Sequence, residues 1–328
     1  MSRFFYGKSF IYGIYQVLAW VVSVMLPPMA VFFPLFTLLE DSGYLPRIAY
    51  NLDRPFQCCK ACGKQALTMA MGFGCNAAGI TGCRIIDSPR ERLIAILTNN
   101  FMPCNGRLPL FITLILLFLC SSQQNASSYA VSALILTLFI LLGIAMTFLS
   151  SYLLSATVLR GVSSSFTLEM PPYRRPQIGK VILRSVTDRT LFVLGRAAAV
   201  AAPAGLILWL LANVSPGGIS LLSRISLILD PLGRLLGMDG VILTAFILGL
   251  PANEIVLPII LMAYTAQGNL TGYASTLQLK QILTANGWTW TTAVCVMLFS
   301  LMHWPCSTTC LTIWKETGSL RWTLAAIA

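Results

Sequence analysis

Charged residues are scarce in this chain, where Asp, Glu, Lys and Arg make up only 10% of 328 residues. Because an ordinary soluble domain carries about 25% charged residues, the composition argues against one. The 22 Lys and Arg outnumber the 11 Asp and Glu, which gives a net charge of +11. Basic residues gather in the cytoplasmic loops of membrane proteins, and no basic run here is interleaved with aromatic residues. We therefore expect no nucleic-acid partner.

Histidine is almost missing as well, since His303 is the only one. This excludes a haem held by two histidines. The tripeptide GKS at 7–9 resembles the end of a phosphate-binding loop, but Ser2 replaces the first glycine of that motif and no strand precedes it. We therefore expect neither a permanently bound cofactor nor an enzyme.

Long apolar runs take the place of charge, and 56% of the residues are hydrophobic. A helix needs about 20 residues to cross roughly 30 Å of hydrocarbon, and an irregular backbone would find no water there. We predict an all-α fold, a polytopic integral membrane helical bundle. The predicted spans are Ile11–Leu39 (kinked or broken by its prolines), Leu93–Cys120, Ala130–Leu159, Leu191–Asn213, Val241–Tyr264 and Trp288–Trp304.

Three further segments do not fit ordinary spans. Ala66–Gly82 and Cys306–Trp314 are too short or too polar, and we predict broken or re-entrant helices, which need protein or a cavity around them. Ser215–Gly237 repeats apolar residues at helical spacing with charges between them. It is predicted to be either an amphipathic helix at the membrane surface or an arm packed on the bundle.

Loop charges orient the predicted bundle. Six basic residues between 160 and 190 indicate a cytoplasmic connection, and the uncharged loop at 121–129 indicates an external one. The basic residues between 47 and 64 then fall outside, against the same rule. The topology of the loops at 40–64 and 265–286 stays open.

The chain repeats a pattern of interrupted helices. A glycine-rich break, GFGCN (72–76), precedes a proline-cysteine break, MPCNG (102–106); later GLPANE (249–254) precedes HWPCSTTC (303–310). Paired broken segments are the best sequence indication of a transporter's binding site. We predict one transmembrane transport domain over 1–328, with a first half at about 1–160, a connection at about 160–189 and a second half at about 190–328.

Three of the ten cysteines, Cys75, Cys104 and Cys306, stand beside a glycine or proline that opens a helix. One such cysteine would be unremarkable, because buried thiols are common, but three indicate a shared role. Thiol, thioether, imidazole and carboxylate ligands suit Fe²⁺, Zn²⁺ or Cu⁺ and do not suit Mg²⁺ or Ca²⁺. The other candidate metal ligands at the breaks are Met102, His303, Asn76, Asn253 and Cys310.

Glu254 places a carboxylate between apolar runs. In a membrane this costs several kcal/mol unless the group is paired or lies in a wet cavity, so Glu254 is a candidate ligand; the alternative is an ion pair with Arg107 or Arg196. Pro103 and Gly106 are interpreted as the cause of the second break. Arg107 is interpreted as a structural residue that pairs with a carboxylate or caps freed carbonyls.

Cys59 and Cys62 form a C-x-x-C, which is typical of a redox pair or of half a zinc site. A four-cysteine zinc site needs a second such pair, and the chain has none. Metal capture, a disulfide outside the membrane and an idle cluster that includes Cys58 remain open.

Five long segments together carry a resemblance to a known family. They are LLEDSGYLPRIAYNLDR (38–54), MGFGCNAAGI (71–80), SPRERLIAILTNNFMPCNGRLPLF (88–111), LGLPANEIVLPIILMAY (248–264) and HWPCSTTCLTIWKETGSLRWT (303–323). In this order they resemble the membrane part of the ferrous iron transport protein B family. The resemblance covers nearly the whole chain.

The resemblance implies a Fe²⁺ importer of the bacterial inner membrane, built on two Gate motifs, with Fe²⁺ as the transported substrate. Cys75 and Cys104 match the first Gate and Cys306 lies near the second, and these are the family's proposed iron-path cysteines. Glu40 and Asp41 match an acidic pair at the end of the first span. Glu254 stands where the family often has another sequence, so its role rests on the reasoning above.

The resemblance also implies partners. Family members carry a cytoplasmic G-protein domain before the membrane part and a further transmembrane helix after it, and we expect both to be missing from this chain. GTP would then act only through a missing or separate G-protein domain, and whether the chain is a fragment or the product of a split gene stays open. Membrane lipid and small accessory Feo proteins are the other implied partners, and a homo-oligomer stays open.

Two alternative functions remain. Gate motifs also resemble those of nucleoside-transporter-like proteins, so the solute could be another one, or another divalent metal such as zinc. A membrane thiol redox protein that uses Cys59 and Cys62 is the alternative from a different class.

Overall fold

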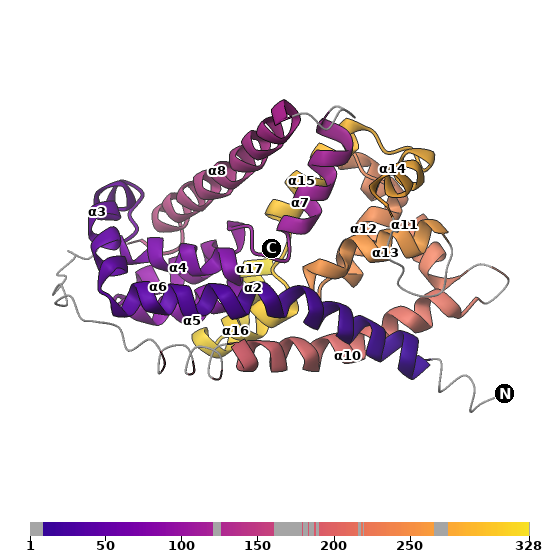
Figure 1. Cartoon of the computed structure of the whole chain (residues 1–328). Helices are drawn as coiled ribbons and strands as arrows, with labels where there is room; N and C mark the ends of the chain where they lie inside the picture. The colour runs from indigo at the N-terminus through magenta and orange to yellow at the C-terminus, as the bar shows by residue number, and fades with distance from the viewer. Residues whose placement is uncertain are drawn as a thin grey trace. The chain divides into compact units, whose positions relative to one another are not determined.

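The computed structural model describes residues 9–120, 126–160, 179, 183, 187, 190–215, 218, 220–265 and 275–327. These residues form helices joined by turns and short irregular links, and none of them lies in a strand (Figure 1). The predicted all-α fold is therefore confirmed.

Four helical segments of the described chain are long and apolar enough to cross a membrane, and a bent pair of helices would make a fifth. The four long segments correspond to four of the six predicted spans. The segments are Ile11–Asp41, Ser128–Ala156, Val193–Asn213 and Trp290–Thr317, and the bent pair is α11 (Leu221–Leu235) with α12 (Gly240–Leu248).

The chain divides into two compact units, which interleave along the sequence. Unit 1 comprises Met1–Val24, Gly106–Thr137 and Arg196–Ser300, and unit 2 comprises Met25–Asn105, Leu138–Gly195 and Leu301–Ala328. Each unit therefore takes segments from both predicted halves. The division into halves at about 160 and 190 stays a prediction.

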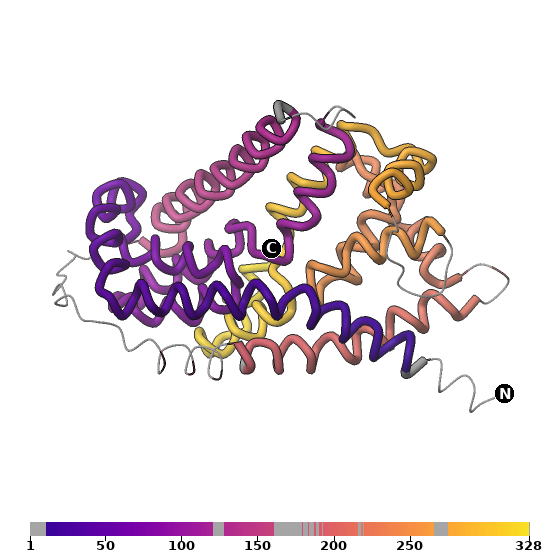
Figure 2. The backbone as a smooth tube through the Cα atoms, in the orientation of Figure 1, coloured from indigo at the N-terminus to yellow at the C-terminus, as the bar shows by residue number. Residues whose placement is uncertain are grey.

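The first helix is not broken by its prolines. A short π-helix (Ser9–Tyr15) continues directly into α2 (Gln16–Asp41), which contains Pro27, Pro28 and Pro34 (Figure 2). The predicted interruption is therefore not a break, and a kink at the prolines stays a prediction. Prolines are tolerated in membrane helices because neighbouring helices and local adjustments satisfy the carbonyls that they free.

Glycines bring backbones together in unit 1. A Cβ added to Gly240, the first residue of α12, would lie 2.0 Å from the carbonyl oxygen of Ser226 in α11. The two helices meet at 108°, so the predicted amphipathic segment packs tightly on the helix that follows it. Its other side exposes Leu227, Ile228 and Leu235. The remaining helices of the unit include α10 (Leu191–Asn213, mostly in unit 1), α13 (Val256–Thr265), α14 (Thr276–Ala285) and most of α15 (Trp290–Met302).

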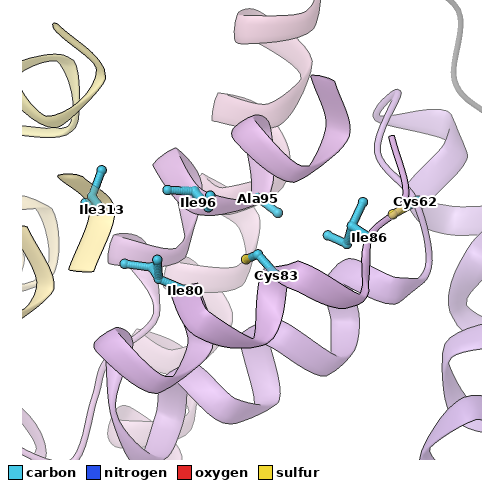
Figure 3. Packing of buried hydrophobic residues seen from close by; sticks show 7 residues of the cluster. All are labelled: Cys62, Ile80, Cys83, Ile86, Ala95, Ile96 and Ile313. Atoms are coloured by element: carbon cyan, nitrogen blue, oxygen red, sulfur yellow. The ribbon is translucent and has the colours of Figure 1, made fainter. Parts of the chain in front are cut away.

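Unit 2 has a core of short helices. Its elements are α3 (Tyr44–Cys58), α4 (Lys64–Gly74), α5 (Asn76–Gly82), a 3-10 turn (Cys83–Ile85), α6 (Pro89–Thr98), α16 (Ser307–Thr317) and α17 (Leu320–Ile327). A hydrophobic cluster joins helices from distant parts of the sequence, with Ile80 of α5, Ile96 of α6 and Ile313 of α16 (Figure 3). Cys62 and Cys83 lie in the same cluster as buried packing residues.

A polar stripe shows which side of α8 (Ala126–Ala156) faces protein. Thr147, Ser151 and Ser155 recur every four residues and are buried, while most of this helix is apolar and exposed. Residues four apart lie on one side of a helix, so this side packs on unit 2. Thr147 donates a hydrogen bond to the sulfur of Met102, Ser151 accepts one from Gln65, and Ser155 accepts one from Arg90.

Two predicted spans are broken helices. In place of Leu93–Cys120, α6 ends at Thr98 and an irregular link at 102–107 precedes α7 (Leu108–Leu114), which a π-helix extends to Leu119. In place of Val241–Tyr264, a link at 249–252 and a 3-10 turn (Asn253–Ile255) separate α12 from α13. Both links contain a proline, which disfavours helix at the residue before it.

Candidate metal-binding residues at the helix breaks

Cys75 is the residue at which the first break occurs. It is extended, with φ −157° and ψ 126°, between the last residue of α4 and the first residue of α5. Its N–H donates to the Met71 carbonyl and its own carbonyl accepts from the Gly79 N–H. Because each neighbouring helix is closed by one of these bonds, the backbone changes direction without leaving Cys75 itself unsatisfied. The side chain is 8% exposed.

Cys306 occupies the matching position before α16. It is the N-cap residue, in an extended conformation, after a link at 303–306 that follows α15. Its sulfur lies 3.1 Å from the hydroxyl of Thr309. Cys310 lies one turn further along α16, and its thiol donates to the Pro305 carbonyl.

The helices that start at these two cysteines run side by side in the same direction. Cys75 lies within electrostatic range of Cys306, and further along Ile80 and Ile313 share one cluster. After the end of α5, Arg84 forms an ion pair with Glu316 at 2.7 Å. The three contacts advance together along both helices, so the two helices are parallel and their cysteines lie at the same end.

Cys104 is the third cysteine at a helix break in unit 2. It is half-buried in the link at 102–107 and also lies within electrostatic range of Cys75. Met102, two residues earlier, lies elsewhere: it is 1% exposed in a hydrophobic cluster with Phe56 and Met69. There its sulfur accepts the hydrogen bond from Thr147.

The other predicted ligands of unit 2 have varied surroundings. His303 is buried at the end of α15, and its carbonyl accepts a hydrogen bond from the Asn100 side chain at 2.8 Å. Its ring packs edge-on against Trp304. Glu40 and Asp41 are the last two residues of α2, where Glu40 is half-buried and Asp41 is exposed.

Unit 1 holds the predicted carboxylate ligand. Glu254 lies two residues after Ala252, an extended residue with φ −155° and ψ 123°. It lines a cavity of about 90 Å³ together with Asn253, Thr113, Gly106 and a majority of apolar side chains such as Trp20 and Leu257. A Cβ on Gly106 would lie 2.6 Å from the carboxylate oxygen Oε1. Gly106 is therefore a point of close approach to Glu254, which sequence reasoning missed.

The alternative interpretation of Glu254 fails. Among the described residues, which include both arginines, no ion pair joins it to Arg107 or Arg196.

The candidate ligands do not form one compact cage. In the part of the chain that the structure describes, no three His, Cys, Asp or Glu side chains are grouped so that they could hold one metal ion. Cys75, Cys104, Cys306 and Cys310 belong to unit 2, whereas Asn253 and Glu254 belong to unit 1.

The C-x-x-C pair is not activated. All cysteines in the structure are free, and Cys62 is buried next to α4 while Cys59 is half-buried. Burial, followed by the charge of Glu91, raises the pKa of Cys62 to about 12; burial also raises the pKa of Cys59. Because the thiolate is the reactive form, these pKa shifts oppose redox chemistry at the pair.

Comparison with known proteins gives two family matches. The Gate family, described as nucleoside recognition, matches residues 22–118 and 194–320. The family described as Ferrous iron transport protein B C terminus matches residues 136–188. No solved structure gives a significant match.

Three curated relatives illustrate the similarity, and each is named Fe(2+) transporter FeoB. The protein of Staphylococcus aureus strain COL is 32% identical over 94% of this chain and 44% of its own length. That of Synechocystis is 30% identical over 96% and 49%, and that of Methanocaldococcus jannaschii is 28% identical over 93% and 45%. The chain thus spans less than half the length of these relatives.

Proposed function

The chain belongs to the Gate family and corresponds to the membrane part of the FeoB family, and from this premise we propose that it carries Fe²⁺ across the bacterial inner membrane. The observation that supports this most is the parallel pair α5 and α16. Each helix starts at a break with a cysteine, and the thiol of Cys104 lies within range of Cys75.

Thiols at helix breaks fit a borderline metal ion. Thiolates prefer ions such as Zn²⁺, Cu⁺ and iron over Mg²⁺ and Ca²⁺, and freed backbone carbonyls at broken helices add oxygen ligands. A transport site must also release its ion. The separation of the donors into small groups, with no three-residue cage among the described side chains, suits such weak and sequential binding.

Glu254 supplies a second position in unit 1 at which the ion could bind. Its carboxylate lies against Gly106 and lines a cavity of about 90 Å³. Sites for drug-sized molecules are typically ~300–1,000 Å³, so this cavity is too small for a nucleoside. This difference favours a metal ion over the nucleoside-like alternative.

Zinc is the competing cargo, because the same thiols bind it as well. The redox alternative is disfavoured by the raised pKa of Cys62. GTP would act through a G protein on another chain or another part of a longer protein, since the relatives are more than twice as long as the matched region. Accessory Feo proteins and a homo-oligomer complete the proposed partners.

Uptake into proteoliposomes tests this function. With a downhill Fe²⁺ gradient under reducing conditions, the double variant Cys104→Ser with Cys306→Ala should lower the initial rate by roughly tenfold or more. Cys295→Ala is the matched control, because that cysteine lies in unit 1 against Gly237. An unchanged rate in the double variant rejects the thiol path, and faster Zn²⁺ than Fe²⁺ uptake reassigns the cargo.

A further inference from the structure

Two buried amides beside the first break have an unused oxygen each. Asn76 and Asn99 are 3% and 1% exposed, and neither Oδ1 has a hydrogen-bond partner among the described residues. The Asn99 side-chain nitrogen donates to the backbone carbonyl of Asn76 at 3.2 Å. This bond assigns the nitrogen and the oxygen of the Asn99 amide, and leaves Oδ1 as the unused acceptor.

The two oxygens converge on one place. A Cβ on Gly72 would lie 3.0 Å from Asn99 Oδ1 and 3.4 Å from Asn76 Oδ1. On the next helix, a Cβ on Gly79 would lie 2.7 Å from the Asn99 nitrogen and 2.8 Å from the Thr68 carbonyl oxygen. Glycine at both positions therefore keeps the surroundings of the two amides clear of side chains.

The surroundings are rich in acceptors. Besides the two amide oxygens, α4 ends at Gly74, next to Cys75, and the C-terminal end of a helix carries a partial negative charge. Buried acceptors are costly unless a donor or a cation satisfies them. Oxygen ligands of this kind suit hard or borderline divalent cations, and broken membrane helices coordinate cations in this way.

We propose that Asn76 and Asn99 form an oxygen-ligand site for a divalent cation, next to the Cys75 thiol. The thiols supply sulfur ligands, and the two amide oxygens replace water molecules in the shell of the bound ion. That the ion is the cargo rests on the proposed function, whereas the binding itself does not.

Two probe metals separate this site from the thiols. The full chain in lipid nanodiscs is titrated with Mn²⁺, followed by electron paramagnetic resonance, and separately with Cd²⁺. All variants carry Glu254→Gln, so that this carboxylate does not contribute. Asn99→Leu removes the oxygen at similar size and should weaken Mn²⁺ binding by roughly tenfold, while Cd²⁺ binding stays within about twofold.

A charge gain gives the opposite result. Asn99→Asp adds a negative charge at the site and should tighten Mn²⁺ binding by roughly tenfold, because ligand charge sets the affinity of oxygen sites. Asn51→Leu and Asn51→Asp, at an exposed position of α3, should change neither metal. The double variant Cys104→Ser with Cys306→Ala should weaken Cd²⁺ binding and leave Mn²⁺ binding unchanged.

The outcomes separate the two claims. If Asn99→Asp and Asn99→Leu both leave Mn²⁺ affinity unchanged, the amides hold only an ordered water and the proposal is overturned. Asn99→Asp alone decides if Asn99→Leu does not fold. If Fe²⁺ uptake is absent while Mn²⁺ still responds to residue 99, the transport function falls and the cation site stands.

Discussion

The breaks at Cys75 and at Ala252 have almost the same backbone. Cys75 has φ −157° and ψ 126°, and Ala252 has φ −155° and ψ 123°. Cys75 directly follows α4, whereas a turn at 249–251 separates Ala252 from α12. Each is followed by a buried asparagine, Asn76 or Asn253, that starts the next helical segment. The same backbone device is therefore used in both compact units.

The chemistry at the two breaks differs. In unit 2 the break carries a thiol, and the neighbouring helix α16 also starts at a cysteine. In unit 1 the same position carries a methyl group, and the carboxylate of Glu254 follows and lies against Gly106. Each unit joins a break from the first predicted half of the chain with one from the second. The backbone of the break determines where side chains can act as metal ligands. The side chains determine whether those ligands are sulfur, as at Cys75, or carboxylate oxygen, as at Glu254.

Replacing the thiol by the methyl group of the other break gives the largest expected effect. Cys75→Ala should fold normally, because Ala252 adopts the same backbone. Cd²⁺ affinity of unit 2 should fall by roughly 100-fold, as measured by titration in nanodiscs. Cys295→Ala, at a packing position, should leave Cd²⁺ affinity unchanged. If Cys75→Ala has an equally small effect, the thiol at the break is not a metal ligand and the two breaks do not differ in this respect.

Crowding the carboxylate should affect unit 1 alone. In Gly106→Ala the new Cβ would lie 2.6 Å from Glu254 Oε1, so the carboxylate must move and the free energy of unfolding should drop by about 1–3 kcal/mol. Cd²⁺ binding at the thiols should persist. Gly195→Ala is the control, because nothing lies within 4 Å of that Cβ; it should be neutral or stabilise. Equal losses for both would show that the clash with Glu254 is not responsible.

The sequence predicted where the helices break and could not predict which breaks meet. The motifs MPCNG and GLPANE contain prolines that disfavour helix locally, and links stand at both places. The approach of Gly106 to Glu254, 148 positions away in the sequence by their numbers, depends on long-range packing. The interpretation of Gly106 as only a helix opener was incomplete for that reason.

Side-chain direction was equally hard to predict. Met102 and Cys104 are two residues apart in an irregular link, where no helical period tells which way a side chain faces. Met102 packs in a hydrophobic cluster and meets Thr147, whereas Cys104 lies near Cys75. Asn99 precedes the same stretch. Two adjacent asparagines between apolar runs, Asn99 and Asn100, were the one sequence signal that polar side chains are buried there.

Removing the ion pair of Arg84 with Glu316 tests the parallel arrangement of α5 and α16 with a smaller expected effect. It joins the ends of the α5 and α16 pair away from the cysteines, so Glu316→Gln should lower the melting temperature slightly, by the equivalent of about 1 kcal/mol or less. It should also loosen Cd²⁺ binding if the helix pair aligns the thiols. Arg234→Gln, which removes an exposed pair within α11, is the control. An Arg234→Gln effect as large as that of Glu316→Gln would contradict this alignment role.

The smallest effect is expected from acid. Lys64, the first residue of α4, forms an ion pair and a hydrogen bond that hold the pKa of Asp87 below its usual value. A lowered pKa in the folded state means that the stabilisation is complete above the ordinary pKa of about 3.9. It is lost as the pH falls through the lower, folded value.

Thermal unfolding between pH 6 and pH 3 measures this loss, and it should be slight because the Asp87 side chain is 89% exposed. Asp87→Asn should flatten that part of the profile. A profile that is the same with and without Asp87 would assign the acid sensitivity to other carboxylates.

X-ray absorption at the iron K-edge tests the central claim most directly. The chain, loaded anaerobically with an equimolar amount of Fe²⁺, should show sulfur among the nearest neighbours of the iron, and Cys75→Ala should reduce that sulfur signal. A first shell of oxygen and nitrogen alone, unchanged by Cys75→Ala, would contradict a thiol path for the metal.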